Sequence, residues 1–139
     1  MTQAEALAVR QAAPQLVRMR ILCADDDPDL RVILEIALRL DPDIEPTIVE
    51  TGAAALRALP NGPWDAILLD AMMPELDGYA TCAALKADPG SRDIPVVFLT
   101  ARTERGEAER ALAVGAKACL SKPFDPMTLA QDLRAVLHG

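Results

Sequence analysis

The feature that most constrains the fold is a regular alternation of short apolar runs with segments of helical periodicity. An apolar run bounded by turn residues, such as Ala66 to Leu69, is typical of a strand buried on both faces. The predicted strands are Met19 to Ala24, Glu45 to Glu50, Ala66 to Asp70, Ile94 to Thr100 and Ala118 to Leu120. Five strand-then-helix units in 139 residues require parallel pairing through right-handed crossovers. The sequence therefore predicts an α/β fold, a doubly wound five-stranded parallel sheet in strand order 2-1-3-4-5 flanked by five helices.

Helical segments follow the strands, and turn residues mark their ends. Asp27-Pro28 provides an N-cap followed by proline, and Asp125-Pro126 repeats this signal before the last helix. The predicted apolar face of the first helix consists of Leu30, Ile33, Leu34, Ala37 and Leu38. The remaining helices are predicted over Ala53 to Leu59, from Asp77 to about Lys86, over Thr103 to Val114 and from Asp125 to Leu137. The helix over Thr103 to Val114 has little apolar character, and Gly115 is expected to end it.

Composition and charge exclude several classes of protein. The net charge of −7 argues against nucleic acid as a direct partner, since a phosphate backbone attracts basic surfaces. No apolar run approaches the roughly 18–20 residues of a membrane span, and no secretory signal is evident, so the expected location is the cytoplasm. The cysteines, Cys23, Cys82 and Cys119, lack the spacing of a zinc site and are expected to be free thiols. Residues 1–18 are predicted to be an N-terminal extension with a loose helical pattern, and residues 19–139 to be one domain.

Acidic residues follow two of the predicted strands. Asp25 and Asp26 come directly after the first strand, and Asp70 ends the third. In the order 2-1-3-4-5 these strands are neighbours, so the three carboxylates are expected in one crevice. Three carboxylates repel one another, and a bound dication removes this conflict; oxygen ligands in a partly hydrated site favour Mg²⁺ over Ca²⁺. Two simpler alternatives are that Asp70 only caps the following turn and that the acidic loops are solvated without an ion.

Two further residues point to phosphoryl chemistry at the same edge of the sheet. Thr100 ends the fourth strand, and Lys122 follows the fifth. A metal, an ammonium and a hydroxyl donor together stabilise the charge on phosphoryl oxygens. Asp70 is then the predicted nucleophile, forming an acyl phosphate.

Four motifs in order make the chain resemble the receiver domain of two-component response regulators, over about Met19 to Leu137. The motifs are ILCADDD (21–27), LLDAMMPELDG (68–78), FLTA (98–101) and KPF (122–124). Each motif alone is modest, but all four at suitable separations are highly specific.

The resemblance implies a set of roles. Asp70 is the phosphoacceptor, taking phosphate from a phosphohistidine on a sensor histidine kinase or a histidine phosphotransfer protein. Mg²⁺ is held by Asp26, Asp70 and the backbone carbonyl of Met72, with Asp25 acting through water. Thr100 and Lys122 bind the phosphoryl oxygens, and the Lys122-Pro123 bond is cis.

The resemblance also implies a signalling domain and not an enzyme, with self-phosphorylation and self-dephosphorylation as its only chemistry. Phosphorylation is expected to switch the face formed by the helix over Thr103 to Val114, the strand over Ala118 to Leu120 and the last helix. That face is also the expected contact for an unidentified output partner or a homodimer. Cys119 departs from the family, whose members usually carry tyrosine or phenylalanine at this position as part of the switch.

Three alternatives are weighed against this interpretation. A phosphatase with an aspartyl nucleophile needs a second aspartate two residues further on, where this chain has Met72. A flavin-binding module needs a Ser/Thr/Gly loop after the first strand, where Asp25 and Asp26 repel a phosphate. A pseudo-receiver, kept only as an interaction surface, is the third alternative.

Overall fold

The computed structural model describes residues 18–101 and 105–139 and contains a five-stranded parallel sheet in the order β2-β1-β3-β4-β5. The strands are β1 (Met19–Ala24), β2 (Ile44–Val49), β3 (Ala66–Asp70), β4 (Val96–Thr100) and β5 (Ala118–Ser121). The helices are α2 (Pro28–Arg39), α3 (Gly52–Ala58), α4 (Gly78–Ala87), α5 (Arg105–Ala113) and α6 (Leu129–His138), and a short 3-10 helix, η1 (Leu59–Asn61), follows α3. The predicted fold class and strand order are confirmed.

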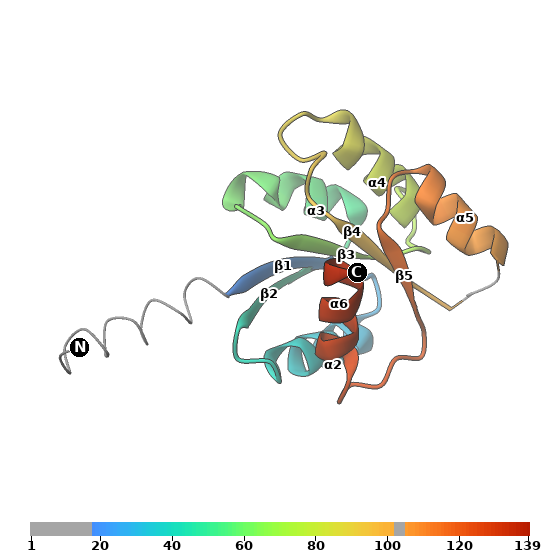
Figure 1. The fold of residues 1–139 in the computed structure, drawn as a ribbon. Coiled ribbons are helices and arrows are strands. Elements are labelled where there is room, and N and C mark those ends of the chain that lie inside the picture. The colour runs from blue at the N-terminus through green and yellow to red at the C-terminus, as the bar shows by residue number, and fades with distance from the viewer. Residues whose placement is uncertain (1–17, 102–104) are drawn as a thin grey trace.

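Two helical layers enclose the sheet, with α3, α4 and α5 on one face and α2 and α6 on the other (Figure 1). The central strand β3 is buried along its whole length. Its side chains alternate between two apolar clusters, because successive residues of a strand point to opposite faces. Ile67 and Leu69 belong to the cluster with α3 and α4, whereas Ala66 and Leu68 belong to the cluster with α2 and α6.

The helix ends that the sequence marks most strongly are confirmed. The Asp27 carboxylate caps α2 by accepting hydrogen bonds from the backbone N–H groups of Asp29 and Leu30, at 3.0 and 3.4 Å. The Asp77 carboxylate accepts from the N–H of Ala80 at 2.8 Å and caps α4. Gly115 adopts a φ of +98° just beyond α5, a conformation that glycine tolerates best. The capping residues in the sequence therefore predict correctly where these helices begin and end along the chain.

The last helix begins later than predicted. Asp125-Pro126 forms a turn in which the Asp125 carboxylate accepts from the Met127 N–H at 2.9 Å, and α6 starts at Leu129. The same pair of residue types that starts α2 therefore makes only a turn here. The Thr128 side chain makes no capping hydrogen bond at the start of α6.

Several other predicted boundaries differ by one or two residues. The predicted strand Glu45 to Glu50 is β2 (Ile44–Val49), the predicted Ile94 to Thr100 is β4 (Val96–Thr100), and β5 continues to Ser121. Thr103, the predicted start of the helix before Gly115, lies outside the described residues, as do residues 1–17 of the predicted extension. No helix in the described part of the chain has the length and hydropathy that a membrane span needs.

An ion pair joins the two helices on one face of the sheet. The Arg134 Nε of α6 lies 2.5 Å from an Asp41 carboxylate oxygen just beyond α2. The hydrogen bond from Arg134 lowers the pKa of Asp41 below its usual value, although partial burial opposes the shift. A lowered pKa means that the folded state favours the ionised carboxylate, so this stabilisation is present at neutral pH and is lost as pH falls through the folded-state pKa.

We therefore expect Asp41→Asn to lower the free energy of unfolding by about 0.5 kcal/mol near neutral pH, a small value because solvent screens the pair. The difference from the parent should shrink on acidification below the usual pKa of an aspartate and disappear below the lowered folded-state pKa, because the parent carboxyl is then protonated as well. Urea unfolding at several pH values measures this. Glu35→Gln, which removes the exposed i,i+4 pair with Arg39, is the matched control and should show almost no effect. An Asp41→Asn deficit that is independent of pH contradicts the assignment.

Candidate functional site

The candidate site lies at the carboxyl ends of β1 and β3, where the chain order of the sheet reverses. From β1 the sheet continues to β2 on one side and to β3 on the other. In such sheets the loops at this point diverge to opposite faces and leave a crevice that binds ligands. Asp25 and Asp26 follow β1, and Asp70 ends β3.

The three predicted acidic side chains come together in this crevice. One carboxylate oxygen from each of Asp25, Asp26 and Asp70 lies within 4.8 Å of the others. Asp25 and Asp70 are buried, whereas Asp26 is exposed and leaves the cluster open to solvent. The predicted convergence of the three carboxylates is therefore found in the structure.

Lys122 places one ammonium between the two buried carboxylates. Its Nζ lies 3.0 Å from an Asp25 oxygen and 3.2 Å from an Asp70 oxygen. The loop after β5 holds the lysine there, because the Lys122 backbone N–H donates to the carbonyl of Thr100 at 2.8 Å. The Lys122-Pro123 peptide bond is cis, as the resemblance implied.

Backbone N–H groups orient the two buried carboxylates. Asp25 accepts a hydrogen bond from the N–H of Asp27 at 2.9 Å, and Asp70 accepts one from the N–H of Met72 at 3.1 Å. The Asp70 side chain therefore does cap the following turn, which was the simpler alternative. That capping is only part of its environment, since the same Asp70 oxygen also faces the Lys122 ammonium.

Burial and charge shift the titration of the two central groups. Burial is the largest influence on Asp70 and, together with the charge of Asp25, raises its pKa, while the Met72 N–H and Lys122 oppose the rise. Burial alone lowers the pKa of Lys122, but the hydrogen bond to Asp25 and the charges of both aspartates outweigh it and raise the pKa. The raised pKa of Lys122 favours its ammonium form, and the raised pKa of Asp70 means that burial and the neighbouring Asp25 destabilise its charged form.

The donor set fits a hard divalent cation. One ammonium cannot neutralise three carboxylates, so the crevice keeps a net negative charge that a cation compensates. Carboxylate oxygens are the ligands that Mg²⁺ prefers, and an open mouth leaves room for the water molecules it retains. This group of residues could therefore hold a metal ion.

Two other predicted site residues are placed in part. Thr100 is buried at the end of β4, where it pairs in register with Ser121 of β5, next to the strand that carries Asp70. The Met72 N–H donates a hydrogen bond to the Asp70 carboxylate, while the Met72 side chain is largely exposed. The proposed contact of the Thr100 hydroxyl with phosphoryl oxygens and of the Met72 carbonyl with a metal remain predictions.

Gly78 lets α4 approach the backbone of Asp70 closely. A Cβ atom at this position would lie 2.3 Å from the Asp70 carbonyl oxygen and 2.9 Å from the Ala71 Cα. The Gly78 N–H donates to the Ala71 carbonyl at 3.1 Å. The loop that carries the site is thereby closed onto the start of α4.

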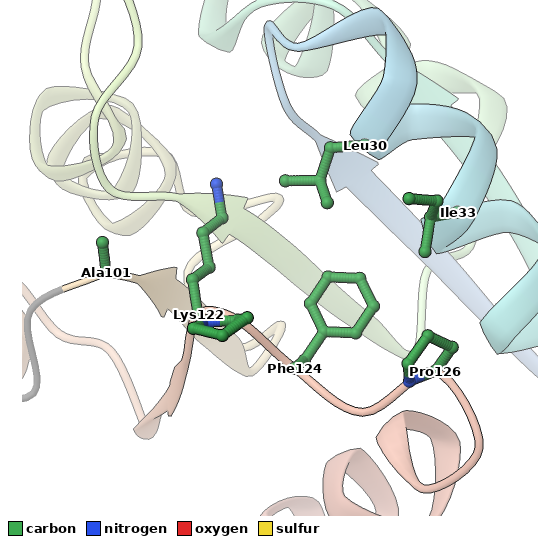
Figure 2. A pocket seen from close by; sticks show the side chains of 7 residues that line it. Leu30, Ile33, Ala101, Lys122, Phe124 and Pro126 are labelled. Carbon is green, nitrogen blue, oxygen red and sulfur yellow. The ribbon is translucent and has the colours of Figure 1, made fainter.

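An apolar hollow of about 430 Å³ borders the site on the side of α2. Figure 2 shows Phe124 and Pro126 facing Leu30 and Ile33 of α2 across it, with Lys122 along its border. Sequence periodicity assigned Ile33 to the buried face of its helix, but 41 % of this residue is exposed. That assignment was wrong for Ile33, because the neighbouring loop leaves the hollow open instead of covering it.

Exposed apolar side chains continue the hollow along α2. Val32 and Ile36 of this helix, Leu40 at its C-cap and Met127 before α6 are each more than half exposed. Several large apolar side chains exposed along one helix commonly mark a contact with another protein. The amphipathic pattern of α2 could not separate this exposed stripe from the buried one, because the apolar residues extend around more than one face.

Comparison with known proteins identifies a family over most of the chain. The family model described as response regulator receiver domain matches residues 21–134. The DNA-binding response regulator MtrA of Mycolicibacterium smegmatis is 38 % identical over 122 residues, which cover 88 % of this chain and 52 % of that protein. The phosphate regulon transcriptional regulatory protein PhoB of Klebsiella pneumoniae is 38 % identical over 120 residues, covering 86 % of this chain and 52 % of that protein.

Solved structures of the same kind superpose closely. The chemotaxis protein CheY4 of Vibrio cholerae has a TM-score of 0.79 at 28 % identity, covering 86 % of this chain and 98 % of that one. The receiver domain of the sensor histidine kinase PA1611 of Pseudomonas aeruginosa has a TM-score of 0.76 at 31 % identity, covering 88 % and 99 % of the two chains. Its structure contains a magnesium ion coordinated in the active site cleft.

The acidic crevice predicts a stabilisation by Mg²⁺ that depends on Asp26. At a free concentration of ten times the dissociation constant, Mg²⁺ should raise the free energy of unfolding by about 1.4 kcal/mol. Asp26→Asn should lose most of this gain. Without Mg²⁺ the same variant should be at least as stable as the parent, because a repelling charge is gone.

Urea unfolding with Mg²⁺ or with a chelator measures both effects. Asp29→Asn is the matched control, since Asp29 is exposed nearby but lies outside the cluster, and it should keep the full gain. Equal losses in the two variants would contradict a metal site at Asp26.

Proposed function

The chain belongs to the response regulator receiver domain family, and from this membership we propose that it is a phosphoacceptor switch in which Asp70 carries the phosphoryl group. The observation that carries the proposal is the position of Asp70, which lies at the end of a buried strand within a cluster of two other carboxylates and one ammonium. A pseudo-receiver that has lost phosphorylation finds no support in this complete set of charged groups.

In the proposed step an Asp70 carboxylate oxygen attacks the phosphorus of a phosphohistidine. The new O–P bond forms as the N–P bond breaks, and the imidazole nitrogen leaves with the electron pair and takes a proton from solvent. Burial makes the Asp70 carboxylate poorly solvated, while the Met72 N–H holds one of its oxygens and leaves the other for attack.

We assign Lys122 and Thr100 to the phosphoryl oxygens. Lys122 lies 3.2 Å from Asp70, so its ammonium can reach a phosphoryl group attached there. Thr100 ends the strand beside β3 and offers a hydroxyl donor from the adjacent position. Asp26, Asp70 and the Met72 carbonyl would hold Mg²⁺, with Asp25 acting through water. The ion would neutralise charge on the carboxylates and on the incoming phosphoryl oxygens.

We propose a sensor histidine kinase or a histidine phosphotransfer protein as the phosphodonor. His138, the one histidine of this sequence, lies at the end of α6, so in this proposal the phosphohistidine comes from outside these 139 residues. The apolar hollow borders Lys122, and together with the exposed stripe of α2 it offers the area on which such a protein docks while its histidine faces Asp70.

The remaining parts of the proposal are the domain boundaries, the partners and the cellular location. The chain spans about half the length of the curated relatives MtrA and PhoB, and the DNA binding in the name of MtrA belongs to that protein. We propose that residues 19–139 form the receiver unit. Because the whole chain has a net charge of −7, we propose that this unit does not itself contact nucleic acid. We also propose that it acts in the cytoplasm on no external substrate. The face of α5, β5 and α6 is the proposed contact for an output partner or a second copy.

The first test is phosphorylation by a small donor. With Mg²⁺ and acetyl phosphate the parent should gain one hydroxylamine-sensitive phosphoryl group, and Asp70→Asn should gain none. Thr100→Val and Lys122→Ala should react about a hundredfold more slowly, because each loses a group that stabilises the transferred charge. Intact-mass spectrometry follows the reaction. Ser121→Ala, which removes a hydroxyl beside Lys122, should react normally; labelling of Asp70→Asn would end the proposal.

A second test separates docking from chemistry. Among the histidine kinases of the source organism, the one that labels the chain fastest is used as the donor. Ile36→Ala should slow this transfer about tenfold, since an exposed contact of the α2 stripe is lost, and should leave labelling by acetyl phosphate unchanged. Leu112→Ala, an exposed leucine of α5, is the control and should leave both rates unchanged. Equal kinase rates for Ile36→Ala and the parent would remove α2 from the docking surface.

A further inference from the structure

Helix α5 is held to the molecule by few apolar contacts. Among the side chains of residues 106–113, only that of Ala111 is buried, and Leu112 points outward with 58 % of its surface exposed. A surface helix normally attaches through a continuous apolar stripe, which this helix lacks. Its position therefore depends on a small number of specific contacts, and its local stability is expected to be low.

Tyr79 of α4 makes the most specific of these contacts. Its hydroxyl donates a hydrogen bond to the Glu107 carboxylate of α5. One turn further along α5, the guanidinium carbon of Arg110 lies 3.9 Å from the centroid of the tyrosine ring, which is a cation–π contact. Two charged side chains of α5 thus converge on a single aromatic residue that is itself buried.

The same ring also contacts the strand that leads to the phosphorylation site. The ring centroids of Tyr79 and Phe98 are 5.0 Å apart, with the planes inclined at 52°. Phe98 precedes Thr100 by two residues on β4, so both side chains point to the same face of the sheet. On the other side, Tyr79 directly follows Gly78, whose N–H is bonded to the Ala71 carbonyl next to Asp70. Tyr79 therefore contacts β4, the strand that ends at Thr100, and directly follows the loop that leads from Asp70 to Gly78.

We propose that Tyr79 is the latch through which the state of Asp70 controls α5. In the unphosphorylated protein the Tyr79 hydroxyl and ring hold Glu107 and Arg110 and keep α5 against the sheet. A phosphoryl group on Asp70 shifts the loop that ends at Gly78 and the end of β4, the ring of Tyr79 moves with them, and its bond to Glu107 is released. This inference rests on the proposed phosphorylation of Asp70 and adds the residue that transmits it.

The surroundings of Tyr79 agree with a strong contact in the resting state. Burial and the hydrogen bond to Glu107 raise the pKa of the phenol to about 12, so the hydroxyl stays a donor throughout the physiological range. Cys119 of β5 packs against the same apolar cluster as Tyr79 and Phe98. The charged partners on α5, Glu107 and Arg110, are oppositely charged, so the latch carries no net repulsion.

Because Tyr79 is the only tyrosine in the chain, fluorotyrosine labelling gives a single fluorine NMR signal. With Mg²⁺ and beryllofluoride, the signal should shift in the parent and stay in place in Asp70→Asn. The same preparation is treated in parallel with acetyl phosphate. If Asp70 is labelled but the fluorine signal does not move, the latch is overturned and the phosphoacceptor function stands; if Asp70 is not labelled, both fall.

Hydrogen exchange of the α5 amides provides the second measurement. Tyr79→Phe keeps the ring and loses the hydroxyl, so the amides of residues 105–113 should exchange about threefold faster or more before phosphorylation and should respond less to beryllofluoride. Glu107→Leu should behave in the same way, and Glu107→Gln, whose amide oxygen still accepts a hydrogen bond, should restore slow exchange. Glu109→Gln removes the same charge from the same helix and is the control. Parent-like exchange in Tyr79→Phe, with normal labelling of Asp70, would overturn the latch.

Discussion

The central constraint on this molecule is the confinement of three carboxylates and one ammonium at the carboxyl ends of two adjacent parallel strands. Asp25 and Asp70 are buried, and both contact Lys122, while backbone N–H groups of the two loops fix their orientation. Like charges so close together destabilise the folded state unless something compensates them. The buried apolar residues of the sheet and its two helical layers stabilise the fold enough to offset this repulsion. The same unfavourable charge favours the binding of a cation and, with it, of a phosphoryl group.

The parts of the fold that follow from local rules could be predicted from the sequence. Buried apolar runs specified the strands, and right-handed crossovers between them left few topologies. Because parallel strands end at one edge of the sheet, the positions of Asp25, Asp26 and Asp70 in the sequence were enough to bring them together. The caps at Asp27 and Asp77 followed from side-chain chemistry that acts over only three residues.

Features that depend on tertiary contacts could not be predicted in the same way. Asp125-Pro126 carries the signal that starts α2, yet the Asp125 carboxylate caps only a turn here, and α6 begins at Leu129. Ile33 shares the periodicity of buried residues but lies beside an open hollow. The bond between Tyr79 and Glu107 joins residues 28 positions apart on two helices, and no local pattern indicates it. These features depend on the distance between a loop or helix and the sheet. The periodicity of apolar residues carries no information on that distance.

Because few buried side chains attach α5 to the sheet, the sequence of this helix can change more freely during evolution than the rest of the domain. Since Ala111 is the only buried side chain among residues 106–113, most positions of this helix can be exchanged without creating a cavity in the interior. New recognition surfaces can therefore evolve on α5 while the acidic crevice and the sheet stay as they are. A modular division of this kind lets duplicated genes acquire separate targets and keep one shared chemistry.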